Sequence, residues 1–276
     1  MNEFVYNDDV VALSPYTGHS LITESAEIAW TFHRLLGGKH KKAGPPAGTG
    51  ILYHAMLLEG GKGVEVIDAD AFRTKEAKAA RDLAISRGLV PIVRPKYEAL
   101  LPTVARIKDN IAKAGYSFDG GQVEAKVEWT EAADYDDVTC HGRIDWLGDD
   151  CANIIDLKTT EGSVHPDACA ASIARDGGAM QEAAYRSAVS SLRPDIAGRE
   201  SFTFLFVELK EPFSVVPIES DGSMRQLGEM RWQRAIQLWS RCMRLNEWPG
   251  YATDGPVRVG APSWALSQEM MEDEHA

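Results

Sequence analysis

The sequence has few cysteines and no long apolar run, and each absence excludes a class of protein. Its four cysteines show no C-x-x-C spacing, which disfavours a zinc site or an iron–sulfur cluster. A reduced, cytoplasmic protein is the simplest expectation. No stretch approaches the roughly 18 apolar residues of a membrane span. Asp8 and Asp9 stand where a signal peptide would carry basic residues, so we expect no association with a membrane.

Basic residues are outnumbered by acidic ones, and the formal net charge is −12. This value taken alone argues against a nucleic-acid partner, but the charges are unevenly distributed. Residues 31–113 contain 15 Lys or Arg against 8 Asp or Glu, whereas residues 1–30 and 114–276 are acidic. A basic region beside an acidic one fits DNA held on one surface and metals on another. The alternative is a solvated helical surface without a partner.

The length of 276 residues and the 44% hydrophobic content allow an ample core. We expect one α/β domain over 1–276, with a mostly helical part at about 20–115, a core of sheet and helices at about 120–250, and a flexible acidic tail at 262–276. Periodicity predicts helices at 23–37, 50–58, 75–87, 95–114, 180–192 and 224–246. Strands are expected at 64–67, 122–129, 138–147 and 153–158, and a hairpin at 202–209 and 213–218.

The tripeptide Asp156-Leu157-Lys158 closes an expected hairpin whose first strand contains Asp145. Residues two apart on a strand share a face, so Asp156 and Lys158 point the same way while Leu157 points into a core. A turn at 148–151 brings Asp145 within about 5–8 Å of Asp156. Two carboxylates and an ammonium then converge, as in a metal-dependent phosphodiesterase.

An acid-x-lysine is a weak signal alone, since chance supplies about one in a chain of this length. The alternative is a surface ion pair at a strand end. Ile154 and Ile155 lead into Asp156, and Ile144 into Asp145, so both carboxylates are embedded in apolar strands. Buried carboxylates need a counter-ion, and a divalent cation is the natural one.

Four further residues are candidates for the same site, each with a structural alternative. Glu124 shares its strand face with Lys126 and Glu128, so either Glu124 or Glu128 could reach the site. The alternative is a solvent-facing pattern. Gln181 and Tyr185 share a helix face and could donate hydrogen bonds to a phosphate, or form a half-buried pair. His54, in an apolar helix, is either a core histidine or a metal ligand.

The order of these residues resembles the PD-(D/E)XK nuclease superfamily, in its RecB and lambda-exonuclease-like branch. More narrowly, it resembles the exonuclease VIII (RecE-type) nuclease domain. The resemblance covers about residues 20–251. Ile144 precedes Asp145 where the superfamily nominally has proline, which leaves the carboxylate in place. It rests on Gly50-x-x-x-His54, Cys140-His141-Gly142-Arg143-Ile144-Asp145, Asp156-Leu157-Lys158-Thr159-Thr160, Gln181-x-x-x-Tyr185 and Asn246-Glu247-Trp248-Pro249-Gly250-Tyr251.

The resemblance implies a restriction-endonuclease-like core, a central mixed β-sheet flanked by helices, with a helical N-terminal region. It implies one or two Mg²⁺ or Mn²⁺ ions, and Lys158 orienting the nucleophilic water. The implied metal ligands are Asp145, Asp156, the Leu157 carbonyl, His54 and Glu124, and the catalytic residues are Asp145, Asp156, Lys158 and Glu124. Substrate phosphates would be bound by Gln181 and Tyr185, and the DNA backbone by Lys39, Lys41, Lys42 and the basic residues from Arg73 to Arg81.

The implied activity is that of a 5′→3′ exonuclease that digests one strand of duplex DNA from an end. A ring-shaped homo-oligomer and a single-strand annealing partner in phage-type recombination are implied as well. Two alternatives stay open from the sequence. One is an endonuclease of the same fold, and the other is a DNA-end-binding protein without catalytic activity.

Overall fold

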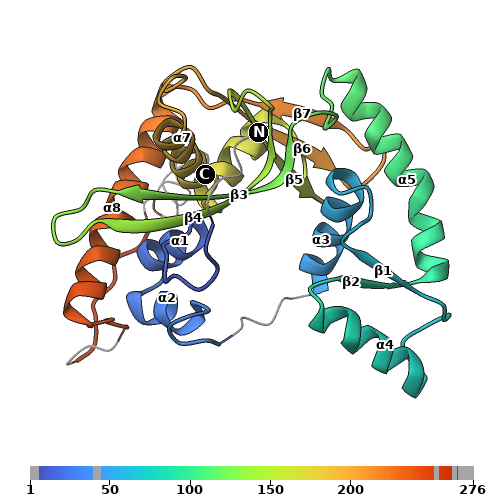
Figure 1. Cartoon of the computed structure of the whole chain (residues 1–276), viewed down its shortest axis with the longest axis horizontal. Coiled ribbons are helices and arrows are strands. Elements are labelled where there is room, and N and C mark those ends of the chain that lie inside the picture. Colours follow the sequence, from blue (N-terminus) through green and yellow to red (C-terminus); the bar gives the residue numbers. More distant parts are fainter. Residues whose placement is uncertain (1–5, 40–44, 252–254, 263–265, 267–276) are drawn as a thin grey trace, which may run out of the picture.

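A five-stranded mixed sheet forms the centre of the protein (Figure 1). The computed structural model describes residues 6–39, 45–251, 255–262 and 266, without the side chains of 45–49. Strands β5 and β6 are parallel, and the other neighbours are antiparallel. The expected central mixed sheet is therefore confirmed. In sheet order the strands are β3 (Gln122–Glu131), β4 (Val138–Leu147), β5 (Asn153–Thr160), β6 (Ser201–Glu208) and β7 (Val215–Ile218).

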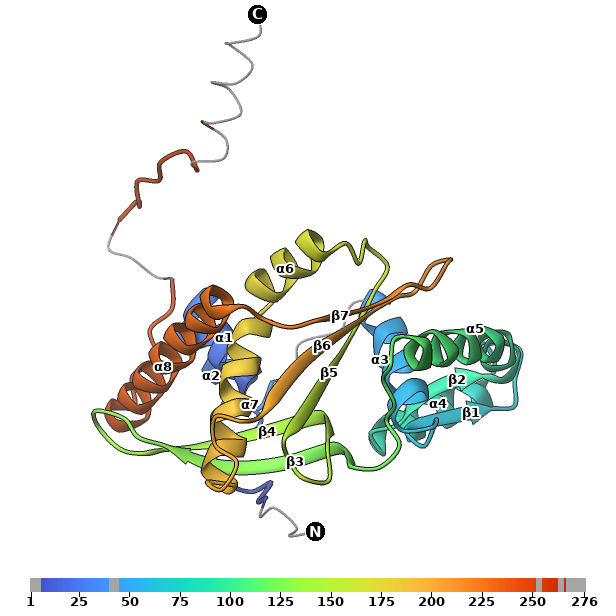
Figure 2. The same cartoon turned by 90° about the horizontal axis from the view of Figure 1, so that it is seen from above.

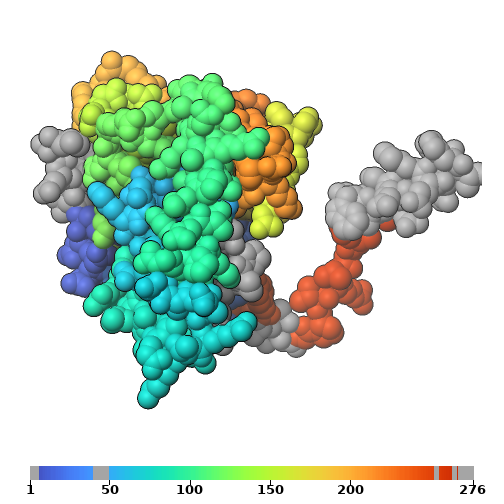
Figure 3. Space-filling view, turned by 90° about the vertical axis from the view of Figure 1, so that its right-hand side faces the viewer, coloured from blue at the N-terminus to red at the C-terminus, as the bar shows by residue number. Residues whose placement is uncertain are grey.

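Helices cover both faces of this sheet (Figure 2). One layer consists of α1 (Pro15–Thr23), α2 (Ala26–Phe32), α7 (Gly178–Leu192) and α8 (Gly222–Leu245), with α6 (Pro166–Arg175) leading into α7. On the other side lies a lobe that Figure 3 shows as one continuous surface. The lobe consists of α3 (Pro45–Leu58), β1 (Val64–Ile67), α4 (Lys75–Ser86), β2 (Val90–Val93) and α5 (Arg94–Lys113).

Two apolar clusters hold these layers to the sheet. Phe202, Phe204 and Phe206 of β6 pack toward α7 and α8, whereas Leu205 and Val207 pack toward the lobe. Strands β5 and β6 are thus buried on both faces, which explains their nearly continuous apolar sequences. Polar side chains that form a site must therefore lie at the ends of these strands or where their pairing is irregular.

Most predicted elements are confirmed, and the helix predicted at 23–37 is present but shorter than predicted. It is α2, which begins after Ser25, whose hydroxyl accepts the Ile28 N–H, and which ends at Phe32. Helices α1 and α6 and strand β2 were not predicted. Lys41, Lys42 and most of the expected acidic tail lie outside the described residues. All four cysteines are buried and free of disulfides, and no helix of the described chain is long and apolar enough to cross a membrane.

Gly228 tests the close packing of α7 against α8. A Cβ at Gly228 would overlap the main-chain carbonyl of Ala179, so Gly228→Ala must push the two helices apart. We expect it to lower the free energy of unfolding by about 1–3 kcal/mol in denaturant titrations. Gly222→Ala is the control, because a Cβ there meets nothing within 4 Å. Equal stability of the two variants would contradict the packing.

Candidate metal centre

The sheet is distorted where Glu124 and Asp145 face each other. The β3–β4 ladder pairs Val123 with Trp146 and Ala125 with Ile144, and it skips the two acidic residues between them. Glu124 has a φ of +54°, a left-handed conformation that costs a non-glycine residue about 1–2 kcal/mol. As a result Val123 and Ala125, two residues apart, pack against different apolar clusters. Backbone strain of this kind gathers at functional sites.

Strands β4 and β5 separate next to this distortion. Their ladder has two pairs, Trp146 with Ile155 and Leu147 with Ile154. Beyond them the carboxylate of Asp145 accepts a hydrogen bond of 2.8 Å from the Leu157 N–H, so a side chain replaces the lost main-chain partner. The N–H and C=O of one strand residue point to the same edge. The Leu157 carbonyl therefore faces the same opening.

Three side chains from three elements gather in this opening. His54 on α3, Glu124 on β3 and Asp145 on β4 offer ligand atoms that lie within 4.8 Å of one another. His54 Nε2 is 3.1 Å from Asp145 Oδ2, and its Nδ1 is 3.5 Å from Glu124 Oε1. Burial lowers the pKa of His54, but the hydrogen bond to Asp145 and the negative charges of Asp145, Glu124 and Asp156 outweigh it, and the net pKa is raised. The donor set of two carboxylates and one imidazole fits a divalent cation such as Mn²⁺ or Mg²⁺.

Asp156 and Lys158 form a buried ion pair beside this cluster. The Asp156 carboxylate is 1% exposed, and the Lys158 ammonium lies 2.6 Å from its Oδ2. Burial raises the pKa of Asp156 to about 6, although the charge of Lys158 opposes the shift. For Lys158, burial lowers the pKa, but the charges of Asp156 and Asp145 more than compensate, and the net pKa is raised. The Asp156 carboxylate thus fixes the Lys158 ammonium next to His54, Glu124 and Asp145.

Gln181 and Tyr185 both face the centre from α7, as their spacing predicts, and both bond to other residues of the protein. The Gln181 amide donates to Asp156 at 2.5 Å and accepts from Lys158 at 2.8 Å. The Tyr185 hydroxyl donates to the Arg143 carbonyl at 2.8 Å. A Cβ at Gly142 would lie 2.7 Å from the Tyr185 ring, so only glycine lets the ring approach β4 this closely. These side chains therefore position the centre, a role that the sequence did not predict.

Arg143 adds a cation that sequence reasoning left without a role. Its Nε lies 2.6 Å from Glu124 Oε2, and its side chain is 68% exposed. Burial raises the pKa of Glu124, whereas the charges of Arg143 and His54 lower it. The spacing of two residues from Asp145 on β4 was the available signal, because it puts both side chains on one strand face.

A cavity of about 670 Å³ opens above the centre. Helices α1, α3 and α7, strand β4 and the segment before α1 contribute to its wall. The described residues that line it include Tyr6, Tyr16, His19, Ile51, His54, His141, Arg143, Asp145, Gln181 and Tyr185. Aromatic side chains, histidines and Arg143 thus line the cavity together with the Asp145 carboxylate.

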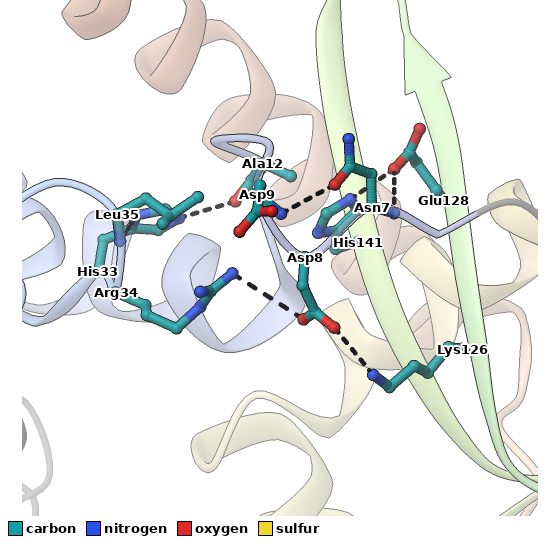
Figure 4. A network of polar contacts seen from close by, with 10 residues as sticks. All are labelled: Asn7, Asp8, Asp9, Ala12, His33, Arg34, Leu35, Lys126, Glu128 and His141. Carbon is teal, nitrogen blue, oxygen red and sulfur yellow. Dashed lines mark hydrogen bonds and ion pairs between the residues drawn. The ribbon is translucent and has the colours of Figure 1, made fainter.

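The segment before α1 is bound along β3 and β4 by polar contacts (Figure 4). Asp8 pairs with Lys126 at 3.1 Å and with Arg34 at 3.9 Å. Glu128 contacts His141 at 2.8 Å and accepts the Asn7 N–H at 3.1 Å. Lys126 and Glu128 thus hold this segment at the cavity wall, and Glu124 is the residue of the three that reaches the donor cluster.

The predicted DNA-guiding lysines lie only partly in the described chain. Lys39 is exposed after α2 and does not line the cavity, and Lys41 and Lys42 fall outside the described residues. Arg73, Lys75 and Lys78 are exposed in and before α4, on the lobe. The basic character of residues 31–113 is therefore displayed mainly on the surface of the lobe.

Comparisons with known proteins agree with this architecture. A family model described as a PDDEXK-like domain of unknown function (DUF3799) matches residues 64–255. No curated protein matches the sequence. A structure from Eubacterium rectale, named as that of a candidate exonuclease, aligns with a TM-score of 0.52 at 13% identity, covering 90% of this chain and 91% of the other. The structure of SSO0001 aligns with a TM-score of 0.29 at 16% identity over 66% of this chain and 83% of its own, which is too remote to support any conclusion.

The left-handed backbone at Glu124 predicts an inverted order of two substitutions. Alanine normally stabilises a strand relative to glycine by about 0.5–1 kcal/mol. At position 124 we expect Glu124→Gly to be more stable than Glu124→Ala by about 1 kcal/mol, because glycine adopts this φ without strain. Chemical denaturation of both variants measures the difference. The ordinary order would contradict the strained backbone.

Proton competition predicts that metal binding weakens in acid. Below pH 6 the Asp156 carboxylate takes up a proton, and protonated His54 cannot coordinate an ion. We expect Mn²⁺ affinity, measured by calorimetry, to fall about tenfold or more from pH 7.5 to pH 5.5. His54→Asn should bind more weakly and with less pH dependence above pH 6. Wild-type affinity that stays constant over this range would exclude these ligands.

Proposed function

The chain belongs to the PDDEXK-like family DUF3799, and on that premise we propose that it is a divalent-metal-dependent nuclease that hydrolyses DNA phosphodiester bonds. One observation carries the proposal. The ligand atoms of His54, Glu124 and Asp145 lie within 4.8 Å of one another. His54 and Asp145 line the cavity, and the Asp156–Lys158 pair lies close by. This arrangement combines metal ligands with an ammonium that can act on a phosphate.

Each residue of the centre has a role in this proposal. When bound, Mg²⁺ or Mn²⁺ supplies Lewis acidity toward the phosphate and acidifies a water. His54, Glu124 and Asp145 would hold the ion, with the Leu157 carbonyl at the same opening. Asp156 lies beside them, in contact with the Lys158 ammonium and the Gln181 amide. Lys158 orients the attacking water and offsets charge that develops on the phosphoryl oxygens. Gln181 keeps the Lys158 ammonium in place through its 2.8 Å hydrogen bond.

We further infer an exonuclease that acts on the ends of duplex DNA, with 5′→3′ polarity. The name of the Eubacterium rectale neighbour, with which the chain shares a fold over nine-tenths of its length, supports the exonuclease part of this proposal. The duplex ends and the polarity come from the family resemblance of the sequence. A ring-shaped homo-oligomer and a single-strand annealing partner belong to the same proposal. The competing function is an endonuclease of the same fold, and the substrates of the assay separate the two.

The assay compares linear duplexes labelled at the 5′ or the 3′ end with a covalently closed circle, in Mg²⁺ or Mn²⁺. We expect nucleotide release from the linear duplexes, no cutting of the circle, and no activity with EDTA. Asp145→Asn and Lys158→Ala should each reduce the rate by about 10²-fold or more, because each removes a ligand or a charge that acts in the transition state. Lys210→Ala, in the exposed turn between β6 and β7, is the matched control.

The pattern of activity decides between the alternatives. Nicking of the circle would assign an endonuclease. Equal activity of Lys158→Ala and wild type, purified in the same way, would contradict the proposed role of this centre. Binding of DNA ends without hydrolysis in either metal would identify a DNA-binding protein instead.

A further inference from the structure

Arg143 contributes a positive charge to the centre that none of the roles above uses. Its guanidinium pairs with Glu124 at 2.6 Å, while 68% of the side chain is exposed. Its main chain is fixed, because the buried Tyr185 hydroxyl donates to its carbonyl. The charged end of Arg143 can therefore turn within the cavity while its attachment to β4 stays in place.

A count of charges indicates when Arg143 is needed at Glu124. Glu124, Asp145 and Asp156 together carry three negative charges when ionised, and Lys158 opposes one of them. A single divalent ion balances the remaining two, so the metal-loaded centre is neutral without Arg143. In the structure His54 and Arg143 lie against carboxylates of the same group, His54 against Glu124 and Asp145 and Arg143 against Glu124. Arg143 and the ion thus compete for the charge of Glu124.

The cavity offers Arg143 a second partner once the ion has taken Glu124. A phosphodiester carries one negative charge, and the planar guanidinium matches two of its oxygens. Arg143 lines the same cavity as Asp145 and His54. We propose that Arg143 alternates between two partners, pairing with Glu124 in the metal-free centre and with a backbone phosphodiester of the nucleic acid in the metal-loaded one. This role rests on the proposed nuclease function.

The role predicts opposite effects of one substitution on two ligands. Removal of the guanidinium leaves Glu124 without a competing cation, so a divalent ion should bind more tightly. The same removal deletes a phosphate contact, so DNA should bind more weakly. An arginine that merely supports the fold or the orientation of Glu124 would weaken both affinities when it is replaced.

The experiment compares Arg143→Gln and Arg143→Lys with a matched control, Arg244→Gln. Arg244 on α8 is 61% exposed and pairs with Asp136 at 3.2 Å, outside the cavity. Mn²⁺ is titrated by calorimetry without DNA. A short fluorescent duplex is then titrated by anisotropy in Ca²⁺ over a series of salt concentrations. Thermal melting of each variant verifies the fold.

For Arg143→Gln we expect Mn²⁺ binding about threefold to tenfold tighter, from the loss of one charge–charge contact. Duplex binding should be about tenfold weaker, and its salt dependence should fall by about one phosphate contact. Arg143→Lys should restore part of the DNA affinity, since lysine keeps the charge without the fork. Arg244→Gln should match wild type in both titrations.

Only tighter Mn²⁺ binding together with weaker DNA binding in Arg143→Gln supports the proposal. Unchanged Mn²⁺ affinity, unchanged DNA affinity, or weakening of both in a folded Arg143→Gln variant each overturns it. A wild-type chain that binds neither Mn²⁺ nor DNA would refute the proposed function together with this role. Wild-type binding of both ligands, with no opposite shifts in the variant, would refute the role of Arg143 alone.

Discussion

The hydrogen bond from the Leu157 N–H to the Asp145 carboxylate is the contact on which the centre depends. Strands β4 and β5 pair at two positions and then separate. A buried main-chain donor left without a partner costs about 1–3 kcal/mol, so the sheet can open there only because Asp145 supplies an acceptor. Asp145 therefore has a structural role, as the acceptor for the Leu157 N–H, and a proposed chemical role as a metal ligand. An asparagine could accept the same hydrogen bond, but it would carry no charge for a metal.

The opening between β4 and β5 gathers charges whose contacts connect the lobe to the sheet. Three acidic side chains converge in a partly buried space, and burial disfavours their ionised forms. The opposing cations come from separate elements, His54 from α3 in the lobe, Arg143 from β4 and Lys158 from β5. His54 thus connects the lobe to the sheet through polar contacts, in addition to the apolar cluster that the lobe shares with β5 and β6. A bound ion would strengthen this connection, because its ligands come from both halves.

Sequence periodicity could predict the part of the centre that follows regular strand geometry. The alternation along 153–158 and the hairpin turn sufficed to relate Asp145, Asp156 and Lys158. Alternation placed Glu124 on one face with Lys126 and Glu128 without choosing among them, and the family resemblance selected Glu124. Its left-handed backbone interrupts the alternation on which such predictions rely. His54 also came from the resemblance, since nothing local in an apolar helix indicates what the histidine faces across a tertiary contact.

Partners and helix breaks were harder to predict, for identifiable reasons. The spacing of Gln181 and Tyr185 indicated a shared face, but their hydrogen bonds depend on how α7 packs against β4 and β5. The helix predicted at 23–37 extends past Phe32, where α2 ends, because the apolar Leu35 and Leu36 continue its stripe. Proline begins both missed helices, at Pro15 and Pro166, and proline in the first turn is a helix-start signal that the sequence contained.

The acidic net charge is compatible with a nucleic-acid substrate once the charges are placed in the fold. Under the proposed function a single bound ion and Lys158 neutralise the three carboxylates of the centre, which therefore exerts little long-range attraction on a phosphate backbone. Attraction over several ångströms must then come from elsewhere on the chain. The exposed basic side chains of α4 and α5, including Lys75, Lys78, Lys108 and Lys113, lie on the lobe that contributes His54. Under this proposal the residues that attract the backbone are separate from most of those that act on the bond, and His54 on α3 is the residue of the centre that the lobe contributes.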